Sequence, residues 1–172
     1  MHLSSRILID EEQLELRIEA MAAAIAADTP EGPTLSVLAL MDGAFMFCAD
    51  LVRRLPMPVR LAFVPLVSIG RGGDPSRVAL PDGFPVEGAD LLVVEDILDT
   101  GQTLGALVDK LQAMKPRRLR LAVLLDKPAG RLVEIEPDYV GFSVDDRWVV
   151  GYGLDSDGLY RNLPYISFME QG

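Results

Sequence analysis

Apolar residues recur at helical spacing in the first part of the chain. The repeated positions are Leu14, Ile18, Met21 and Ile25. Asp10 precedes this stripe as a candidate N-cap, and Gln13, three residues later, completes the pattern of a capping box. The segment 30–33, with two prolines and a glycine, cannot continue a helix. The sequence therefore predicts a helix that starts at Asp10 and ends before this segment.

Further helices and strands alternate along the rest of the chain. A second helix is predicted to present Phe45, Cys48, Ala49 and Val52 on one face, and a third to present Leu104, Leu107, Val108, Leu111 and Met114. Apolar runs predict strands over 35–40, 60–67, 91–94, 119–125, 139–142 and 148–152. Pro65 places the second of these strands at a sheet edge or a strand end. The alternation predicts an α/β fold with a twisted parallel sheet flanked by helices, in which ligands bind beyond the carboxyl ends of the strands.

The segment 69–88 is rich in glycine and proline and shows no sustained periodicity. Connections of about 20 residues are long for a compact domain and are typical of a lid, a binding loop or local disorder. No repeat, low-complexity tract or polar linker divides the chain. We therefore expect a single domain over residues 1–172, with a mobile lid over 69–88.

The composition is that of a soluble globular protein, with 49% hydrophobic and 24% charged residues. The formal net charge of −10 opposes binding to a nucleic-acid backbone, and we interpret the basic cluster 115–118 as a solvated turn. No apolar run reaches the length of about 20 residues that spans a bilayer, and the first residues contain no long apolar stretch. These features predict a cytoplasmic protein that binds neither membranes nor nucleic acids.

The single histidine, His2, and the single cysteine, Cys48, narrow the possible chemistry. We expect His2 to lie at a frayed end and Cys48 to pack in an apolar stretch. This distribution excludes zinc sites built from Cys and His ligands, and catalysis by Ser-His-Asp or Cys-His groups. Acid–base chemistry therefore falls to carboxylates or to one of three lysines, Lys110, Lys115 and Lys127.

The strongest constellation lies where the buried run 91–94 leads into a predicted helix. Glu95 and Asp96 follow the run, and a short loop then presents Asp99, two threonines and Gly101. Backbone N–H groups at a helix N-terminus suit a phosphate, and a glycine lets the main chain approach it. Adjacent acids beside such a cradle suit either a sugar diol or a hydrated Mg²⁺. The alternative is a capped helix with solvated acids, although three clustered acids are costly without a partner.

This stretch resembles the phosphoribosyl pyrophosphate signature of the type I phosphoribosyltransferases: four apolar residues, two acids, two apolar residues, then Asp-Thr-Gly-x-Thr. From about residue 35 to 166 the chain resembles the hypoxanthine–guanine branch of that family, in Leu125-Asp126-Lys127 and in the blocks 137–142, 149–155 and 160–164. The resemblance implies a type I phosphoribosyltransferase-like sheet with a small C-terminal hood. It also implies Mg²⁺ as cofactor and assembly as a homodimer or homotetramer.

The resemblance further implies a role for each matching residue. Glu95 and Asp96 would contact the ribose hydroxyls and Mg²⁺, and Asp155 a second Mg²⁺. The 5′-phosphate would lie against Thr100, Gly101, Gln102 and Thr103, and Asp99 would be the general acid–base group near purine N7. The purine would be held by Lys127 at O6, by stacking on Trp148, and by Val149 and Asp155. Pyrophosphate would be held by Arg161 and by the turn at Asp42 and Gly43.

The chemistry of single residues supports part of this assignment. Lys127 directly follows an apolar strand, so its ammonium is expected at the binding edge, where an O6 carbonyl accepts a hydrogen bond and an adenine amino group clashes. Taken without the resemblance, Lys127 could instead pair with Asp126. Trp148 could equally belong to the core, and Arg161 could be exposed to solvent.

Three positions depart from the family pattern. Asp42 stands where the pyrophosphate turn usually carries a lysine, so backbone amides around Gly43 would have to bind the pyrophosphate. The lid usually reads Ser-Tyr and here reads Ser68-Ile69. The stacking position, Trp148, more often holds phenylalanine.

The resemblance predicts a purine-salvage enzyme that joins phosphoribosyl pyrophosphate to a 6-oxopurine base. Two alternatives stay open at this point. One is a relative that prefers xanthine, and the other is a regulator that binds phosphoribosyl pyrophosphate without turnover. The acidic composition weighs against a regulator that binds nucleic acid.

Overall fold

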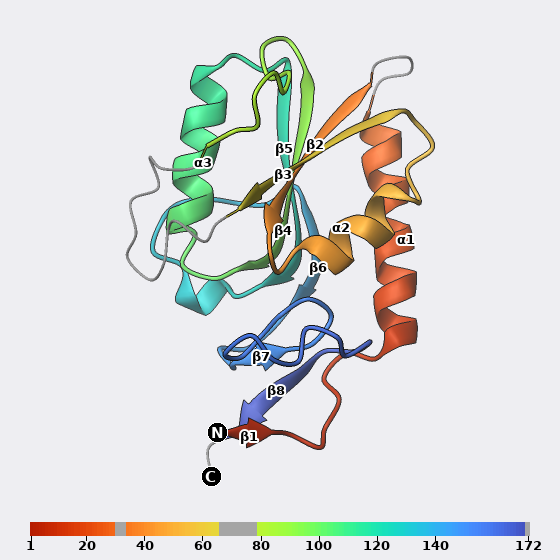
Figure 1. The fold of residues 1–172 in the computed structure, drawn as a ribbon, viewed down its shortest axis with the longest axis vertical. Helices are drawn as coiled ribbons and strands as arrows, with labels where there is room; N and C mark the ends of the chain where they lie inside the picture. Colours follow the sequence, from red (N-terminus) through yellow and green to blue (C-terminus); the bar gives the residue numbers. More distant parts are fainter. Residues whose placement is uncertain (30–33, 66–78, 171–172) are drawn as a thin grey trace.

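The computed structural model describes residues 1–29, 34–65 and 79–170, and its centre is a five-stranded sheet (Figure 1). The strands are β2 (Leu35–Met41), β3 (Val59–Pro65), β4 (Asp90–Leu98), β5 (Arg118–Asp126) and β6 (Tyr139–Ser143). They lie in the order β3-β2-β4-β5-β6, and every neighbouring pair is parallel. The predicted parallel sheet is confirmed, and β3, which ends in Pro65, is an edge strand as predicted. Ser68 and Ile69 of the predicted lid lie outside the described residues.

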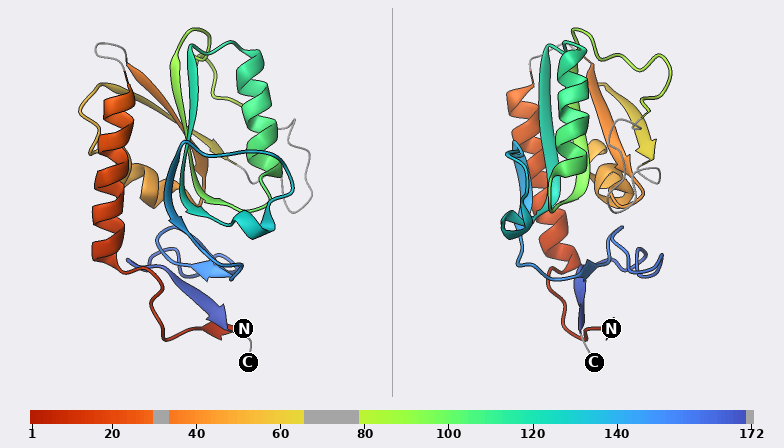
Figure 2. Two further views of the ribbon diagram at one scale, coloured as in Figure 1. Left: turned by 180° about the vertical axis from the view of Figure 1, so that it is seen from behind. Right: turned by 90° about the vertical axis from the view of Figure 1, so that its left-hand side faces the viewer.

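Helices cover both faces of the sheet (Figure 2). The helices α1 (Glu11–Asp28) and α2 (Phe45–Val52) lie on one face, and α3 (Gln102–Ala113) lies on the other. Each face therefore has its own apolar core, which is why β2 and β4 are buried along most of their length. Within the described part of the chain, no helix is both long and apolar enough to cross a membrane.

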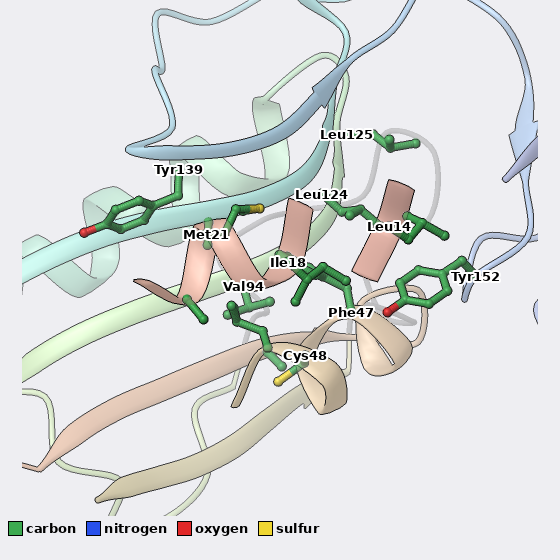
Figure 3. Packing of buried hydrophobic residues seen from close by; sticks show 14 of the residues in the cluster. Leu14, Ile18, Met21, Phe47, Cys48, Val94, Leu124, Leu125, Tyr139 and Tyr152 are labelled. Carbon is green, nitrogen blue, oxygen red and sulfur yellow. The ribbon is translucent and has the colours of Figure 1, made fainter. Parts of the chain in front are cut away.

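The start of α1 is the predicted capping box. Asp10 Oδ1 accepts the Gln13 N–H at 2.8 Å, and Gln13 Oε1 accepts the Asp10 N–H at 3.0 Å. The predicted apolar stripe of this helix is buried and consists of Leu14, Ile18, Met21 and Ile25. Figure 3 shows the first three of these side chains in the core beside α2 and the sheet. The predicted helix is therefore confirmed in its start and in its buried face.

The predicted face of α2 is right at Cys48 and Val52 and wrong at Phe45 and Ala49. The residues that α2 buries are Phe47, Cys48 and Leu51. Phe45 and Ala49, which belonged to the predicted face, are exposed. Most residues of this helix are apolar, so the spacing of apolar residues fits either of two faces. The preceding turn determines which face is buried, because Ala44 is already buried there. Burial raises the pKa of the Cys48 thiol to about 11, in agreement with a packing role.

The predicted stripe of α3 is confirmed except at its end. The buried members are Leu104, Leu107 and Leu111. Met114 lies past the last helical residue and is 40% exposed. The chain turns away directly afterwards, at Lys115, which has a φ of +56°.

A small antiparallel sheet lies beyond the carboxyl ends of the parallel strands (Figure 1). Its strands are β1 (His2–Leu3), β8 (Ser167–Glu170) and β7 (Val149–Val150), in the order β1-β8-β7. We call residues 1–9 and 144–170 the hood. The predicted strand over 148–152 belongs to the hood and not to the main sheet, and the hood is built from both ends of the chain and not from the C-terminal part alone.

The N-terminus is not frayed, because β8 has a pairing partner on each side and β1 supplies the second one. His2 pairs with Glu170 in the register of these strands. The two side chains meet as well, with 3.4 Å between His2 Nε2 and Glu170 Oε2. The expectation of a loose end was wrong because the partner strand is distant in the sequence.

Candidate active site

Two adjacent carboxylates lie near the carboxyl end of β4. Glu95 is 8% exposed, and its Oε1 accepts the Asp96 N–H at 3.2 Å. Burial, followed by the negative charge of Asp96, raises the pKa of Glu95 well above its usual range. Asp96 Oδ1 accepts the Ile97 N–H at 2.9 Å. The acids lie together as predicted, but β4 continues past them to Leu98 instead of ending at Val94.

The turn after β2 lies against this acid pair. A Cβ at Gly43 would overlap the Asp96 carboxylate, so a larger residue there would displace that side chain. Gly153 of the hood lies against the same turn, because a Cβ there would overlap the Gly43 carbonyl oxygen. Asp42, the neighbour of this glycine, is exposed. Three segments that are distant in sequence therefore meet at Gly43.

The loop between β4 and α3 borders a hollow of about 250 Å³. The lining includes Glu95, Asp96, Asp99, Thr100, Gly101 and Thr103. Gly101 is the N-cap of α3 and has a φ of +76°, a conformation that favours glycine. The N-terminus of α3, which begins at Gln102, thus presents its N–H groups and the positive end of its dipole at the hollow. The structure brings the residues of the predicted phosphate loop together.

Lys127 lies one strand further along the sheet, directly after β5. Its side chain is 8% exposed and lies 3.7 Å from Asp146 Oδ1. Its Nζ donates a hydrogen bond to the Arg147 carbonyl oxygen. The alternative pairing with Asp126 is wrong, because that carboxylate binds Arg131 instead. Lys127 therefore holds a buried positive charge at the edge where ligands bind.

Trp148 and Val149 follow the carbonyl group that accepts from Lys127. Trp148 is 44% exposed, so the alternative in which it belongs to the core is wrong. Val149 is buried in β7. An exposed aromatic residue close to a buried ammonium suits a flat ligand that carries a hydrogen-bond acceptor.

Arg161 and Asp155 form an ion pair in the hood. Arg161 Nη2 lies 3.0 Å from Asp155 Oδ1, and Nη1 donates to the Gly153 carbonyl oxygen at 2.6 Å. The second oxygen of Asp155, Oδ2, accepts the Gly158 N–H at 2.8 Å. The Arg161 side chain is half-buried. Because Gly153 touches Gly43, this ion pair stands next to the turn after β2.

The carboxylates fit Mg²⁺ in the way that proteins bind this ion. Mg²⁺ keeps several waters and takes one or two carboxylates together with substrate phosphates. Over residues 1–29, 34–65 and 79–170, no group of three or more His, Cys, Asp or Glu side chains could hold a metal. Glu95 and Asp96 nonetheless bring two carboxyl groups together, one buried and one half-buried, and a bound cation would favour the ionised form of both. Asp155 lies apart and pairs with Arg161.

Two further contacts at the site were not predicted from the sequence. Tyr152 of the hood donates from its hydroxyl to Asp50 Oδ2 of α2. Arg131, four residues after Lys127, donates to the Asp99 carbonyl oxygen at 3.0 Å. No local spacing links the members of either pair. The sequence shows only that an arginine lies four residues after Lys127. That position alone does not predict a contact with Asp99.

Comparisons with known proteins agree with this geometry. The profile of the phosphoribosyl transferase domain matches residues 5–157. The bifunctional protein TilS/HprT of Listeria monocytogenes serotype 4b is 41% identical over 168 residues, which make up 96% of this chain and 26% of that protein. A hypoxanthine-guanine phosphoribosyltransferase of Bacillus subtilis is 35% identical over 172 residues, which cover 98% of this chain and 95% of the relative.

The fold agrees with a solved structure as well. A crystal structure of a hypoxanthine-guanine phosphoribosyltransferase (hpt-2) from Bacillus anthracis superimposes with a TM-score of 0.87 at 37% sequence identity. The similarity covers 99% of this chain and 100% of that chain. By contrast, the chain spans only 26% of the length of the bifunctional Listeria relatives.

Proposed function

This chain belongs to the phosphoribosyl transferase family, and on that premise we propose that it acts in purine salvage. It transfers the 5-phosphoribosyl group from phosphoribosyl pyrophosphate to N9 of hypoxanthine or guanine, and gives IMP or GMP and pyrophosphate. The proposal rests on the groups that meet at one edge of the sheet. There the β4 acids, the glycine-capped start of α3 and the buried ammonium of Lys127 lie on neighbouring strand ends.

The end of β4 and the start of α3 hold the phosphoribosyl group. The 5′-phosphate lies in the hollow beside residues 99–103, where main-chain N–H groups and the dipole of α3 stabilise an anion. Glu95 and Asp96 accept hydrogen bonds from the ribose hydroxyls. When bound near these carboxylates, Mg²⁺ supplies positive charge that stabilises the leaving pyrophosphate.

The neighbouring strand ends hold the purine. Lys127 donates to O6, and this selects 6-oxopurines because the amino group of adenine would bring a second donor toward the ammonium. The base stacks on Trp148 and meets the backbone of Val149. Asp99 exchanges the proton at N7, and its carboxylate lies against Gly130, where a Cβ would overlap Asp99 Oδ1.

The turn after β2 and the hood hold the pyrophosphate. Its oxygens accept from the N–H groups around Gly43 and from Arg161, whose planar guanidinium can bind phosphate in a bidentate manner. Arg161 pairs with Asp155 in the structure, so pyrophosphate binding exchanges one anionic partner for another. The freed Asp155 carboxylate can then take part in binding a second Mg²⁺.

The substitution Asp99→Asn tests the acid–base role. The amide keeps the size of the side chain but cannot exchange a proton, so kcat with hypoxanthine should fall by about 10²–10⁴-fold, measured as IMP formation with Mg²⁺ present. Asp109→Asn, at an exposed position of α3, is the control and should retain full activity. A decrease smaller than about tenfold in Asp99→Asn would reject the role.

A steady-state assay of four bases tests the substrate class. Guanine and hypoxanthine should release pyrophosphate, adenine should not, and removal of Mg²⁺ by a chelator should stop the reaction. A preference for xanthine would show that the substrate is a 6-oxopurine other than hypoxanthine or guanine. Binding of phosphoribosyl pyrophosphate without product from any base would make the protein a regulator instead.

We further propose, from resemblance to the family alone, a cytoplasmic homodimer or homotetramer. Sedimentation velocity at the concentration of the assay measures this directly. A single species with the mass of one chain would reject the assembly and leave the proposed reaction untouched.

A further inference from the structure

Arg131 binds four acceptors around the phosphate loop. Its side chain is only 16% exposed. Nε donates to the Asp99 carbonyl oxygen at 3.0 Å, and Nη1 donates to the Ile135 carbonyl oxygen at 2.6 Å. Nη2 reaches the Leu98 carbonyl oxygen at 3.5 Å and also binds the Asp126 carboxylate. All three nitrogens of the guanidinium are thus engaged, two of them with the loop that leads from β4 to α3.

The backbone of the same segment binds this loop too. The Leu132 N–H donates to the Thr100 carbonyl oxygen at 2.9 Å. The Lys127 N–H donates to the Leu98 carbonyl oxygen, also at 2.9 Å. The three consecutive carbonyl groups of residues 98–100 therefore all point toward the segment that follows β5.

The direction of these carbonyl groups determines the direction of the N–H groups in the same peptide units. In a planar trans peptide, the N–H points away from the C=O of the same unit. The carbonyl groups of residues 98–100 share their peptide units with the N–H groups of residues 99–101. These N–H groups therefore point away from the segment after β5, and the residues that carry them, 99–101, line the hollow. An array of N–H groups with one direction is what a phosphate needs.

The shape of the contact requires an arginine. A guanidinium presents its donors in a rigid planar fork, whereas an ammonium is a compact point charge and cannot span the same set of acceptors. The packing is close as well, since a Cβ at Gly101 would lie 3.1 Å from Arg131 Cδ. Gly130 meets the Asp99 carboxylate in the same way. The segment 128–131 therefore supports the loop without a gap.

We propose that Arg131 is a positioning residue for the phosphate loop. It holds the backbone of residues 98–100 so that the N–H groups face the 5′-phosphate and Asp99 stays in place beside the base. Arg131 touches no reacting atom and acts through the loop alone. The identity of the phosphate rests on the proposed function, whereas the positioning role rests on the contacts described here.

The substitution Arg131→Lys tests the role, because it keeps the charge and removes the fork. The KM for phosphoribosyl pyrophosphate should rise about tenfold, while the KM for hypoxanthine should change by less than about twofold. Arg17→Lys is the matched control. Arg17 also donates to two main-chain carbonyl groups, those of Gly141 at 2.7 Å and of Val140, but on β6, away from the loop. It should leave both KM values unchanged.

Hydrogen exchange gives a second measurement that needs no turnover. Exchange of the Lys127 and Leu132 amides, which donate to the Leu98 and Thr100 carbonyl groups, should accelerate by about tenfold in Arg131→Lys and not in Arg17→Lys. If the unmodified protein forms no nucleotide from any base, the proposed function fails. In that case the exchange rates, together with binding of ribose 5-phosphate as the probe, still decide whether Arg131 positions the loop.

Three outcomes would overturn the inference. The first is an equal change in both KM values, and the second is a lower melting temperature with unchanged KM values and unchanged exchange of the Lys127 and Leu132 amides. If Arg131→Lys does not fold, Arg131→Gln, which keeps a planar group with fewer donors, is measured by the same criteria. The third outcome is that neither variant folds while Arg17→Lys does, because Arg131 would then determine stability and not position.

Discussion

At the scale of single residues, Asp42 places a negative charge where the proposed pyrophosphate binds. Its side chain is exposed, and the Asp96 carboxylate lies against the adjacent Gly43. Two carboxylates beside one glycine repel a polyanion, although solvent and salt weaken the repulsion at an exposed position. The turn therefore has to attract pyrophosphate through its N–H groups, through Arg161 and through a bound cation.

Replacement of Asp42 by lysine should strengthen pyrophosphate binding. The change from a negative to a positive charge at an exposed position contributes about 1 kcal/mol, so Kd for pyrophosphate with Mg²⁺ should fall about fivefold at low salt. Calorimetric titration measures this, and the gain should shrink at high salt. Asp109→Lys, at an exposed acid of α3, controls for the change in net charge. An unchanged or higher Kd in Asp42→Lys would show that the turn does not face pyrophosphate.

The positions of the site residues could be predicted from the sequence, but their partners could not. Lys127 and the acids Glu95 and Asp96 follow apolar runs, and residues at the ends of parallel strands meet at one edge of the sheet. Asp126, in contrast, precedes Lys127 and yet pairs with Arg131. Asp126 is the last residue of β5 and Lys127 lies beyond the strand, so their adjacency in the sequence does not predict a contact between the two side chains.

At the scale of elements, the spacing of apolar residues predicted the existence of the main strands and failed at the hood. The strands of the main sheet are runs of five to nine residues, long enough to show a pattern. β1 and β7 have two residues each, and β8, which pairs with both, lies at the other end of the chain from β1. Such short strands are set by distant partners and carry no periodicity of their own.

A partly buried hydrogen bond joins the hood to α2, and Tyr152→Phe should weaken that junction. The Tyr152 hydroxyl donates to Asp50, so its loss should lower the free energy of unfolding by about 1–2 kcal/mol in urea. Burial, and then Asp50, raise the pKa of Tyr152. The contribution is therefore fully present below the usual tyrosine pKa of about 10, and is lost only as the pH rises above it.

Tyr139→Phe is the control for this prediction. The Tyr139 hydroxyl donates to Asp28 at 3.0 Å and accepts from Arg120, near the amino ends of the strands. The Asp28 side chain is 56% exposed and already forms an ion pair with Arg120 at 3.2 Å. Because these two partners keep each other and solvent when the hydroxyl is removed, the loss of stability should be smaller than in Tyr152→Phe. Equal losses in the two variants, or an unchanged midpoint in Tyr152→Phe, would contradict the junction.

At the scale of the whole molecule, the hood shares a core with the sheet. The cluster that contains the buried face of α1 also contains hood residues, namely Val149, Tyr152, Leu154, Ile166 and Phe168. Figure 3 shows Tyr152 next to Phe47 of α2. A hood that buries its apolar residues in the main core cannot open without exposing part of that core. The single domain predicted from the sequence likewise implies that the hood and the main sheet unfold together.

Unfolding should therefore occur in one step. Trp148 is the single tryptophan and lies in the hood, so its fluorescence reports on the hood, while far-UV circular dichroism reports mainly on the main sheet and helices. The two urea transitions should coincide. Ile166→Ala should shift both together, by about 2–5 kcal/mol in the free energy of unfolding. A fluorescence transition at lower urea than the dichroism transition would instead make the hood a separate unit.

The pairing of His2 with Glu170 joins the first strand of the chain to the last. Deletion of β1 would remove one of the two partners of β8, whereas deletion of β8 would remove the partner of both β1 and β7. The effect of shortening the chain at one end therefore depends on the strand at the other end.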